Sequence, residues 1–150
     1  MKAIRELRPE DDLAAVLALC KEFFAEYEGY HTKFFGTDNL CDADISGRFL
    51  QSMQSNDSAT IIALLDSEIV GYALLAVREQ PRFYKIKKVG AISGLMVAKN
   101  HVRKGIGARL LAESKAYFRR KGIKYFTLYT AVANRGASRF YLALFVDKRL

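Results

Sequence analysis

One stretch of the sequence, from Ile92 to Leu111, constrains the fold most; it reads ISGLMVAKNHVRKGIGARLL. It predicts a strand, a short basic loop and then Gly105-x-Gly107 at the start of a helix. Two glycines there let the backbone come close to a ligand, and first-turn N–H groups have no partner within the helix. Together with the helix dipole, and with Arg103 and Lys104 beside it, these donors suit a phosphate group.

Two nucleotide-binding motifs fit this stretch poorly. A P-loop needs Gly-Lys-Ser/Thr at its end, but Gly107 is followed by Ala108 and Arg109. A dinucleotide fingerprint needs a third glycine where Leu110 stands, and it follows the first strand of its domain rather than the fourth. A Gly-x-Gly alone is weak evidence, so the identity of the phosphate ligand stays open at this point.

The spacing of apolar residues along the chain predicts one α/β domain, residues 1–150, in the order β-α-α-β-β-β-α-β-α. This order is typical of a mixed sheet flanked by helices. The strands are expected at 2–7, 60–65, 69–77, 87–98 and 124–132. The helices are expected after Pro9 and at 43–53, 105–121 and 137–144.

Several residues mark the ends and irregularities of these elements. Pro9 suits the first position of a helix, and Glu10 to Asp12 place negative charge at its positive end. Asp66 to Glu68 predicts a hairpin turn, and Gly122 a helix stop. Gly90 and Gly94 within a strand indicate a bulge or a close backbone approach.

Composition excludes several classes of protein. Half of the 150 residues are hydrophobic and 18 are Phe or Tyr, which excludes a disordered chain. Neither a run of about 20 apolar residues nor a signal peptide is visible, so we expect a cytoplasmic protein. Cys20 and Cys41 are too few for a disulfide framework, and the histidines lie far apart, so no metal site is expected.

Charge is divided unevenly between the two halves of the chain. Residues 1–81 carry 7 Lys/Arg and 14 Asp/Glu, whereas residues 82–150 carry 17 Lys/Arg and only Glu113 and Asp147. This asymmetry indicates two surfaces of opposite sign. Two interpretations remain open: solvated surface on both sides, or a basic half that binds a polyanion and an acidic half that faces a cation.

The sequence resembles the GNAT superfamily of N-acetyltransferases in two separate motifs. The family has R/Q-x-x-G-x-G/A at the end of its fourth strand, often after L-x-V; here the matching residues are Leu95, Val97, Gly105 and Gly107. Its downstream pattern of Asn, Ala and Phe-Tyr is matched by Asn134, Ala137, Phe140 and Tyr141. The order of elements extends the resemblance over nearly the whole chain.

Two departures from the family pattern matter. Val102 stands where the family has Arg or Gln, which is expected to weaken the grip on pyrophosphate without abolishing it. The family commonly adds two more strands after the position of Phe145. We therefore expect either a shortened C-terminal end or a second subunit, as in a homodimer, that covers the exposed edge of strand 124–132.

The resemblance implies acetyl-CoA as co-substrate and direct attack of a primary amine in a ternary complex. It places the pantetheine arm against Leu95, Met96 and Val97. Tyr141 is the candidate general acid for the departing thiolate, with core packing as the alternative, and Asn134 either contacts the coenzyme or only caps a helix. The pyrophosphate is assigned to the segment Val102, Arg103, Lys104, Gly105, Ile106, Gly107 and Ala108.

The acceptor side is less clear from the sequence. The fourth strand has no acid to act as general base, and the remaining candidates are Glu28, His31, Glu79 and Tyr129. Acidic residues of the first two helices and their connection suggest a cationic acceptor, such as a polyamine, an aminoglycoside or a basic peptide, although a solvated helix face is the favoured explanation. They are Glu22, Glu26, Glu28, Asp38, Asp42 and Asp44.

Two rival functions are weighed against catalysis. A non-catalytic acyl-CoA sensor is compatible with the missing acid and the short end, because fold alone does not establish activity. A nucleic-acid-binding module is suggested only by the basic second half. Its basic residues are spread over several elements with no interleaved aromatic motif, so this function is disfavoured.

Overall fold

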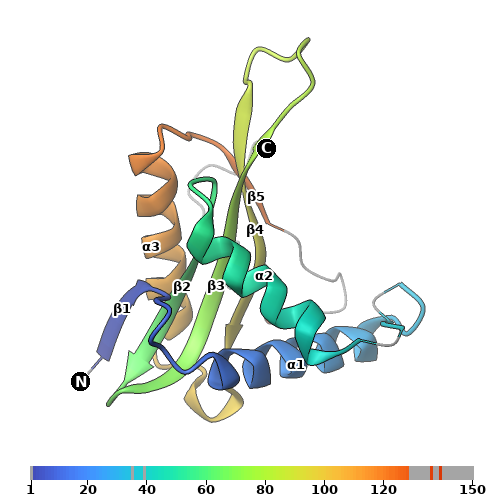
Figure 1. Ribbon diagram of the computed structural model, residues 1–150, viewed down its shortest axis with the longest axis vertical. Coiled ribbons are helices and arrows are strands. Elements are labelled where there is room, and N and C mark those ends of the chain that lie inside the picture. Colours follow the sequence, from blue (N-terminus) through green and yellow to red (C-terminus); the bar gives the residue numbers. More distant parts are fainter. Residues whose placement is uncertain (1, 35, 39, 129–135, 137–138, 140–150) are drawn as a thin grey trace.

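The computed structural model describes residues 2–34, 36–38, 40–128, 136 and 139 (Figure 1). Its strands are β1 (Lys2–Glu6), β2 (Ser58–Leu65), β3 (Glu68–Glu79), β4 (Lys88–Val97) and β5 (Phe126–Leu128). Its helices are α1 (Leu13–Tyr30), α2 (Asp42–Gln54) and α3 (Ile106–Arg120), and a 3-10 turn spans Lys99–His101. Within the described residues, the elements follow the expected order.

The strands form one sheet in the order β1-β2-β3-β4-β5. Neighbouring strands from β1 to β4 are antiparallel, whereas β4 and β5 are parallel. A parallel pair needs a crossover connection, and α3 supplies it. The prediction of an α/β fold with a mixed sheet is confirmed.

Successive side chains along the strands point to opposite faces of the sheet, and each face carries a hydrophobic core: the α3 core on one face and the α1 core on the other. Ile61 packs in one core with Leu110 and Phe118 of α3. Ile62, the next residue, packs in the other core with residues of α1 and α2 such as Val16. Because each fully buried aliphatic side chain stabilises the fold by about 1.5–3 kcal/mol, a one-residue slip of β2 would be costly.

The start of α1 corrects the prediction for Pro9. The helix begins at Leu13, and Asp12 is its N-cap, accepting a hydrogen bond from the Ala15 amide. Asp11 instead closes a turn, because its carboxylate accepts a 2.7 Å hydrogen bond from the Arg8 amide and two more from the Arg5 side chain. These contacts take the acidic residues out of the first helical turn, so neither Pro9 nor Glu10 begins the helix.

The β2–β3 hairpin turns on two residues with positive φ. Leu65 pairs with Glu68, and Asp66 and Ser67 between them have φ of 49° and 69°. Such left-handed pairs match the twist of the flanking strands. The expected hairpin is confirmed, with Glu68 in the strand rather than in the turn.

An irregularity in β4 lies where the glycines indicated one. Ile92 faces Leu75 and Gly94 faces Leu74, so Ser93 is an extra residue in the ladder. Gly90 is a close approach: a Cβ there would lie 2.5 Å from the Phe118 ring. Both interpretations of the in-strand glycines are thus realised, one at each end of the same segment.

After Leu128, only residues 136 and 139 are among the described residues. β5 covers Phe126–Leu128 of the strand expected at 124–132, while 129–132 and most of the helix expected at 137–144 lie outside the described residues. β5 is the edge of the sheet as described. A homodimer through this edge stays a prediction.

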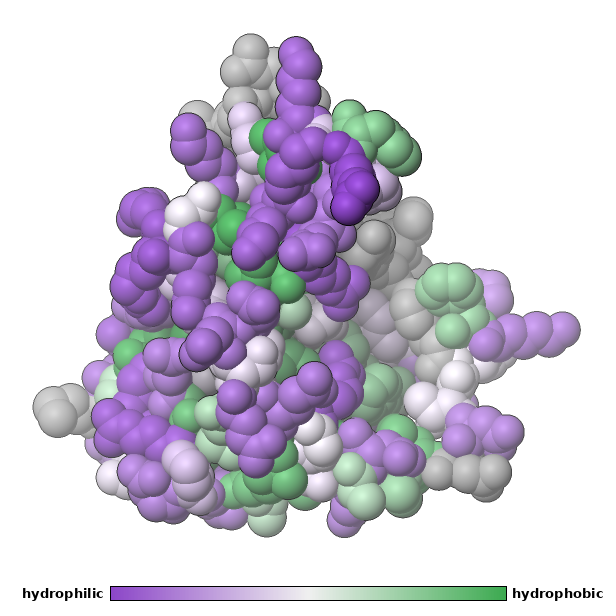
Figure 2. All heavy atoms as spheres, turned by 45° about the horizontal axis from the view of Figure 1, so that its top comes forward, coloured by the Kyte–Doolittle hydropathy of each residue, from purple (hydrophilic) through white to green (hydrophobic). Residues whose placement is uncertain are grey.

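The surface in Figure 2 is mostly hydrophilic, with hydrophobic atoms in scattered patches. No helix within the described ranges is long and apolar enough to cross a bilayer. Cys20 is buried at 2% exposure among core residues, as expected, and burial raises the pKa of its thiol. The described part of the chain contains no cluster of His, Cys, Asp or Glu able to hold a metal ion.

Candidate functional site

A cavity of about 670 Å³ opens at the C-terminal end of β4. It extends from the start of α3 and its preceding loop to one face of α1. Eight of its lining residues belong to the segments singled out in the sequence: Leu95, Met96, Val97, Val102, Arg103, Gly105, Gly107 and Ala108. The chain therefore folds so that the end of a strand and the Gly-x-Gly helix start share one space.

The loop before α3 owes its shape to two residues with positive φ. Gly105, the N-cap of α3, has φ 79° and ψ 5° and makes no side-chain cap. Arg103 has φ 63°, which is unusual and strained for a residue with a Cβ. The amides of the first helical turn, at Ile106, Gly107 and Ala108, have no intrahelical acceptor and lie at the positive end of the helix dipole.

Three residues of this loop and of the helix start differ in how they contribute to the cavity. Val102 lines the cavity and is 49% exposed, so an apolar side chain lies where the family has Arg or Gln. Lys104 is not among the lining residues; its carbonyl accepts a 2.9 Å hydrogen bond from Lys2 Nζ, which fastens the loop to β1. The Ile106 side chain is buried in the α3 core, so only its backbone is available to a ligand.

The end of β4 contributes both faces of the strand to the site. Leu95 and Val97 pack on the α3 core, whereas Met96 between them packs in the α1 core. The described pairing of β4 with β5 runs from Gly90 to Ile92. The rest of the expected fifth strand, residues 129–132, lies outside the described residues.

The opposite wall comes from α1, and of its residues only Glu26 was singled out from the sequence. Phe23, Glu26 and Tyr27 line the cavity. The two rings are stacked, with centroids 4.5 Å apart. Both rings continue the regular apolar spacing of α1, and Phe23 also packs against the core on that face of the sheet. A signal was present, because the i, i+3, i+4 spacing puts a carboxylate on the same helix face as the two aromatic residues.

Glu26 is held in place by its own helix. It accepts a 2.8 Å hydrogen bond from the Tyr30 hydroxyl. Burial, followed by this bond to Glu26, raises the pKa of Tyr30 to about 12, so Tyr30 remains a neutral donor. The carboxylate thus keeps one fixed partner and further lone pairs for a ligand.

The expected general-base candidates lie elsewhere. Glu28 and His31 are exposed and do not line the cavity, and the His31 ring accepts a hydrogen bond from the Phe34 amide. Glu79 pairs with Lys88, at the opposite end of the β3–β4 ladder from Val97. Tyr129 lies outside the described residues. Glu26 is therefore the carboxylate that the described structure brings to the site.

The acidic residues of α1 and α2 do not act as one cluster. Asp42 forms an ion pair with Lys21 at 2.5 Å, and Asp44 accepts hydrogen bonds from the backbone and thiol of Cys41 at the start of α2. Of the six acidic residues singled out in the sequence of the first two helices and their connection, only Glu26 lines the cavity. The solvated-face interpretation therefore fits most of this group.

Asn134 and Tyr141, the remaining candidates, lie outside the described residues. Gly136 and Arg139 are described, and both line the cavity. Gly136 and Arg139 therefore lie at the site, and Arg139 adds a basic side chain to that of Arg103.

Residues 16–145 match the model of the acetyltransferase (GNAT) family, which covers most of the chain. The protein belongs to the GNAT family of acetyltransferases. The resemblance carried by the Gly105–Gly107 motif is thereby confirmed.

Solved structures share this GNAT fold over nearly their whole length. The BH1408 protein of Bacillus halodurans, as a tetramutant, has a TM-score of 0.82 at 21% identity, covering 99% of this chain and 95% of that one. The aminoglycoside acetyltransferase AAC(6')-Iy, solved with the bisubstrate analogue CoA-S-monomethyl-acetylneamine, has a TM-score of 0.79 at 18% identity, with 100% and 93% covered.

A third neighbour comes from an uncultured soil metagenomic sample. It is the aminoglycoside acetyltransferase meta-AAC0020 in complex with trehalose, with a TM-score of 0.73 at 23% identity, covering 99% of this chain and 91% of that one. No curated protein matches the sequence. At these identities the neighbours support the GNAT fold.

Proposed function

We propose that this protein is an acetyl-CoA-dependent N-acetyltransferase that acetylates a small cationic amine by direct attack in a ternary complex. The observation that carries the proposal is the continuity of one cavity. It joins the anion-binding start of α3, the end of β4 and the carboxylate of Glu26. A donor and an acceptor held in such a space meet without a covalent intermediate on the protein.

The residues present fit acetyl-CoA. The first-turn amides of α3 and the side chains of Arg103 and Arg139 suit the pyrophosphate, because they offer N–H donors and positive charge at one end of the cavity. Leu95 and Val97 offer an apolar wall and strand backbone to the pantetheine arm. The coenzyme supplies a thioester-activated acetyl group, and a backbone N–H of this strand end is suited to polarise its carbonyl.

The α1 wall suits a protonated amine. The Glu26 carboxylate attracts a cation, and the stacked Phe23 and Tyr27 rings offer faces that bind cationic groups. Placing both reactants in one cavity supplies roughly 7–11 kcal/mol of barrier lowering when their reacting atoms are aligned. The named aminoglycoside acetyltransferases among the structural neighbours act on molecules of this charge type, which supports a cationic acceptor.

Tyr141 completes the proposal as general acid for the departing thiolate. A tyrosine side chain has an ordinary pKa of about 10, so it holds its proton at neutral pH and can give it to a sulfur anion. Asn134 is proposed as a further coenzyme contact. We also propose a single catalytic domain, residues 1–150, that works in the cytoplasm.

Calorimetric titration with acetyl-CoA tests the coenzyme site. Gly107→Glu places a carboxylate at the anion site and should abolish binding. Gly47→Glu is the matched control, because Gly47 is a helical glycine of α2 with nothing within 4 Å of its Cβ position and lies outside the cavity. Binding lost in both variants, or absent from the unsubstituted protein, contradicts the proposed site.

Transfer is tested by thiol release from acetyl-CoA with a mixed panel of amines. Release that depends on a cationic amine supports the acetyltransferase. Tight coenzyme binding without transfer to any amine instead identifies the acyl-CoA sensor, and the catalytic proposal fails.

A further inference from the structure

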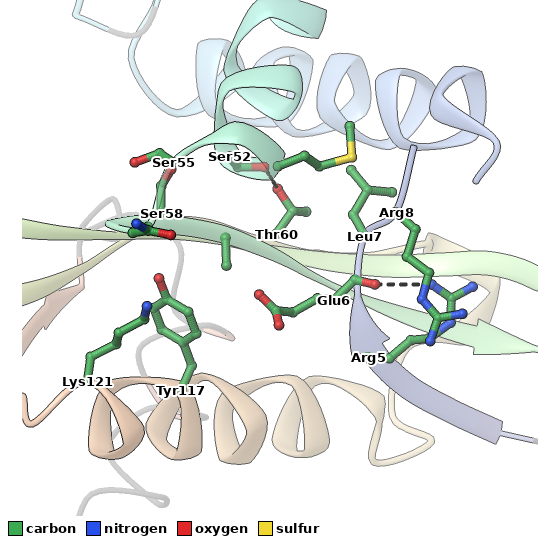
Figure 3. A pocket seen from close by; sticks show the side chains of 13 residues that line it. Arg5, Glu6, Leu7, Arg8, Ser52, Ser55, Ser58, Thr60, Tyr117 and Lys121 are labelled. Atoms are coloured by element: carbon green, nitrogen blue, oxygen red, sulfur yellow. Dashed lines mark hydrogen bonds between the residues drawn. The ribbon is translucent and has the colours of Figure 1, made fainter. Parts of the chain in front are cut away.

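A second cavity, of about 520 Å³, lies where β1 ends and β2 begins (Figure 3). The C-terminal ends of α2 and α3 close it from the two faces of the sheet. It shares no lining residue with the cavity at the end of β4. The family motifs and the proposed reaction make no use of it.

The most informative group in this cavity is the hydroxyl of Tyr117. The residue is 4% exposed, and its oxygen is buried with no hydrogen-bond partner among the described residues. Figure 3 shows this hydroxyl directed from α3 toward Ser58 across the cavity. An unpaired buried hydroxyl destabilises the fold, so a ligand that pairs with it removes that cost on binding.

The Tyr117 hydroxyl keeps its proton at neutral pH. Burial raises its pKa, and the negative charges of Glu6 and Asp57 raise it further. Tyr117 therefore presents a hydroxyl that can donate to an anion.

Two opposite charges flank this hydroxyl without neutralising each other. Glu6 and Lys121 both line the cavity, and Figure 3 shows them on either side of the Tyr117 hydroxyl. The ion pairs among the described residues do not include a Glu6–Lys121 pair. Lys121 Nζ instead lies 5.7 Å from the centroid of the Tyr117 ring.

Arg5, Ser52 and Thr60 are already paired, whereas Arg8 adds a second positive charge to the lining. The Arg5 guanidinium donates two hydrogen bonds to the carboxylate of Asp11. It also donates to the backbone oxygen of Glu6, at 3.0 Å. Ser52 and Thr60 are hydrogen-bonded to each other at 2.8 Å. The hydroxyls of Ser55 and Ser58, at the same end as Tyr117, add polar lining.

We propose that this cavity binds a small zwitterion of the amino-acid type, with its ammonium group at Glu6 and its carboxylate at Lys121 and the Tyr117 hydroxyl. A simple cation would meet Lys121 and Arg8, and a simple anion would leave the Glu6 carboxylate without a partner. A molecule carrying both charges satisfies both ends and pairs the buried hydroxyl. The serine hydroxyls suit a polar side chain, so L-glutamine is the probe of choice.

The test follows backbone amide chemical shifts during titration with L-glutamine. Saturable shifts are expected at Glu6, Ser58 and Lys121 and not at Gly107. Two charge-deleted analogues provide the comparison: glutaramate lacks the ammonium group, and 4-aminobutanamide lacks the carboxylate. Each should bind at least about tenfold more weakly, because each loses one charge-assisted interaction.

Variants assign each charge to its residue. Glu6→Gln should remove the preference for glutamine over glutaramate, and Lys121→Gln should remove the preference over 4-aminobutanamide. Lys124→Gln and Glu10→Gln are matched controls, because both residues are exposed and lie outside the cavity. Tyr117→Phe should weaken glutamine binding about tenfold while the protein stays folded, since the hydroxyl has no partner to lose.

Three outcomes overturn the proposal: no saturable shift with glutamine, equal binding of the charge-deleted analogues, or shifts that survive both Glu6→Gln and Lys121→Gln. The result does not depend on the acetyltransferase proposal. Acetyl-CoA binding at Gly107 is measured separately, and either site can fail while the other stands.

Discussion

Arg5 and Asp11 are joined by a bidentate contact, in which the two guanidinium nitrogens donate to the two carboxylate oxygens at 2.8 Å and 2.7 Å. The contact ties β1 to the turn that leads into α1. The hydrogen bond from Arg5, together with one from the Arg8 amide, lowers the pKa of Asp11 from its ordinary 3.8 to about 2. The pair therefore couples the fold to acidic pH.

We expect Asp11→Asn to lower the free energy of unfolding at pH 7 by about 1 kcal/mol, a value that allows for solvent screening. Because the folded pKa is depressed, the contribution is present above the unfolded pKa and is lost as pH falls from about 4 through about 2. Urea unfolding at pH 7 and in this acidic range measures it. Glu10→Gln is the control; a difference between wild type and Asp11→Asn that does not shrink with acid contradicts the assignment.

Two glycines at the ends of α3 allow a matched pair of substitutions. Gly105 and Gly122 have φ of 79° and 74°, and neither has an atom within 4 Å of its Cβ position. Gly105→Ala and Gly122→Ala should each cost about 1 kcal/mol of stability from backbone strain alone. Only Gly105→Ala should also weaken acetyl-CoA binding, by about tenfold, because it shifts the amides that we propose hold the coenzyme.

Chemical denaturation and calorimetry on the same samples separate the two effects. Equal loss of coenzyme affinity in both variants would mean that the effect follows stability and not the site.

Glu26 should act on the acceptor and not on the coenzyme. Glu26→Gln removes the charge that faces the cavity and should raise the KM of a cationic amine about tenfold, with the KM of acetyl-CoA unchanged. Glu28→Gln, on the exposed side of the same helix, should leave both constants alone. Steady-state kinetics with a polyamine measures this, and equal behaviour of the two variants removes Glu26 from the acceptor site.

Tyr141→Phe tests the proposed general acid. We expect kcat to fall by about 10²–10⁴-fold with the KM of acetyl-CoA unchanged, because only protonation of the departing thiolate is lost. Tyr84→Phe, at an exposed tyrosine, is the control. A stability loss with kcat preserved would instead assign Tyr141 to core packing.

The sequence predicted what depends on local chemistry. Helix α3 was expected at 105–121 and spans Ile106–Arg120, because its apolar period is regular and a glycine stands at each end. The hairpin at Asp66 and Ser67 was equally local. The cavity wall at Leu95–Val97 followed from the motif that it shares with a known family.

The sequence did not predict what depends on contacts between distant elements. Pro9 does not begin α1, because Arg5 draws Asp11 into a turn that no periodicity reports. Phe23 and Tyr27 continue the apolar spacing of α1, and that spacing does not report that their rings also line a cavity. The cavity at Tyr117 is formed by the ends of β1, β2, α2 and α3, which are far apart in the sequence, so no local sequence pattern predicts it.

Ser93 has a consequence for how this chain can vary. Ile92 packs toward α3, and Met96, which an unbroken strand would place on the same face, packs toward α1 because Ser93 is an added residue between them. The Ser93 side chain makes one 3.3 Å hydrogen bond to the Leu74 carbonyl. Its replacement by another small residue is therefore tolerable. Its deletion would leave Ile92 and Met96 three positions apart in a regular strand, and hence still on opposite faces. The bulge is thus an added residue that the strand can lose without exchanging the side chains that face each helix.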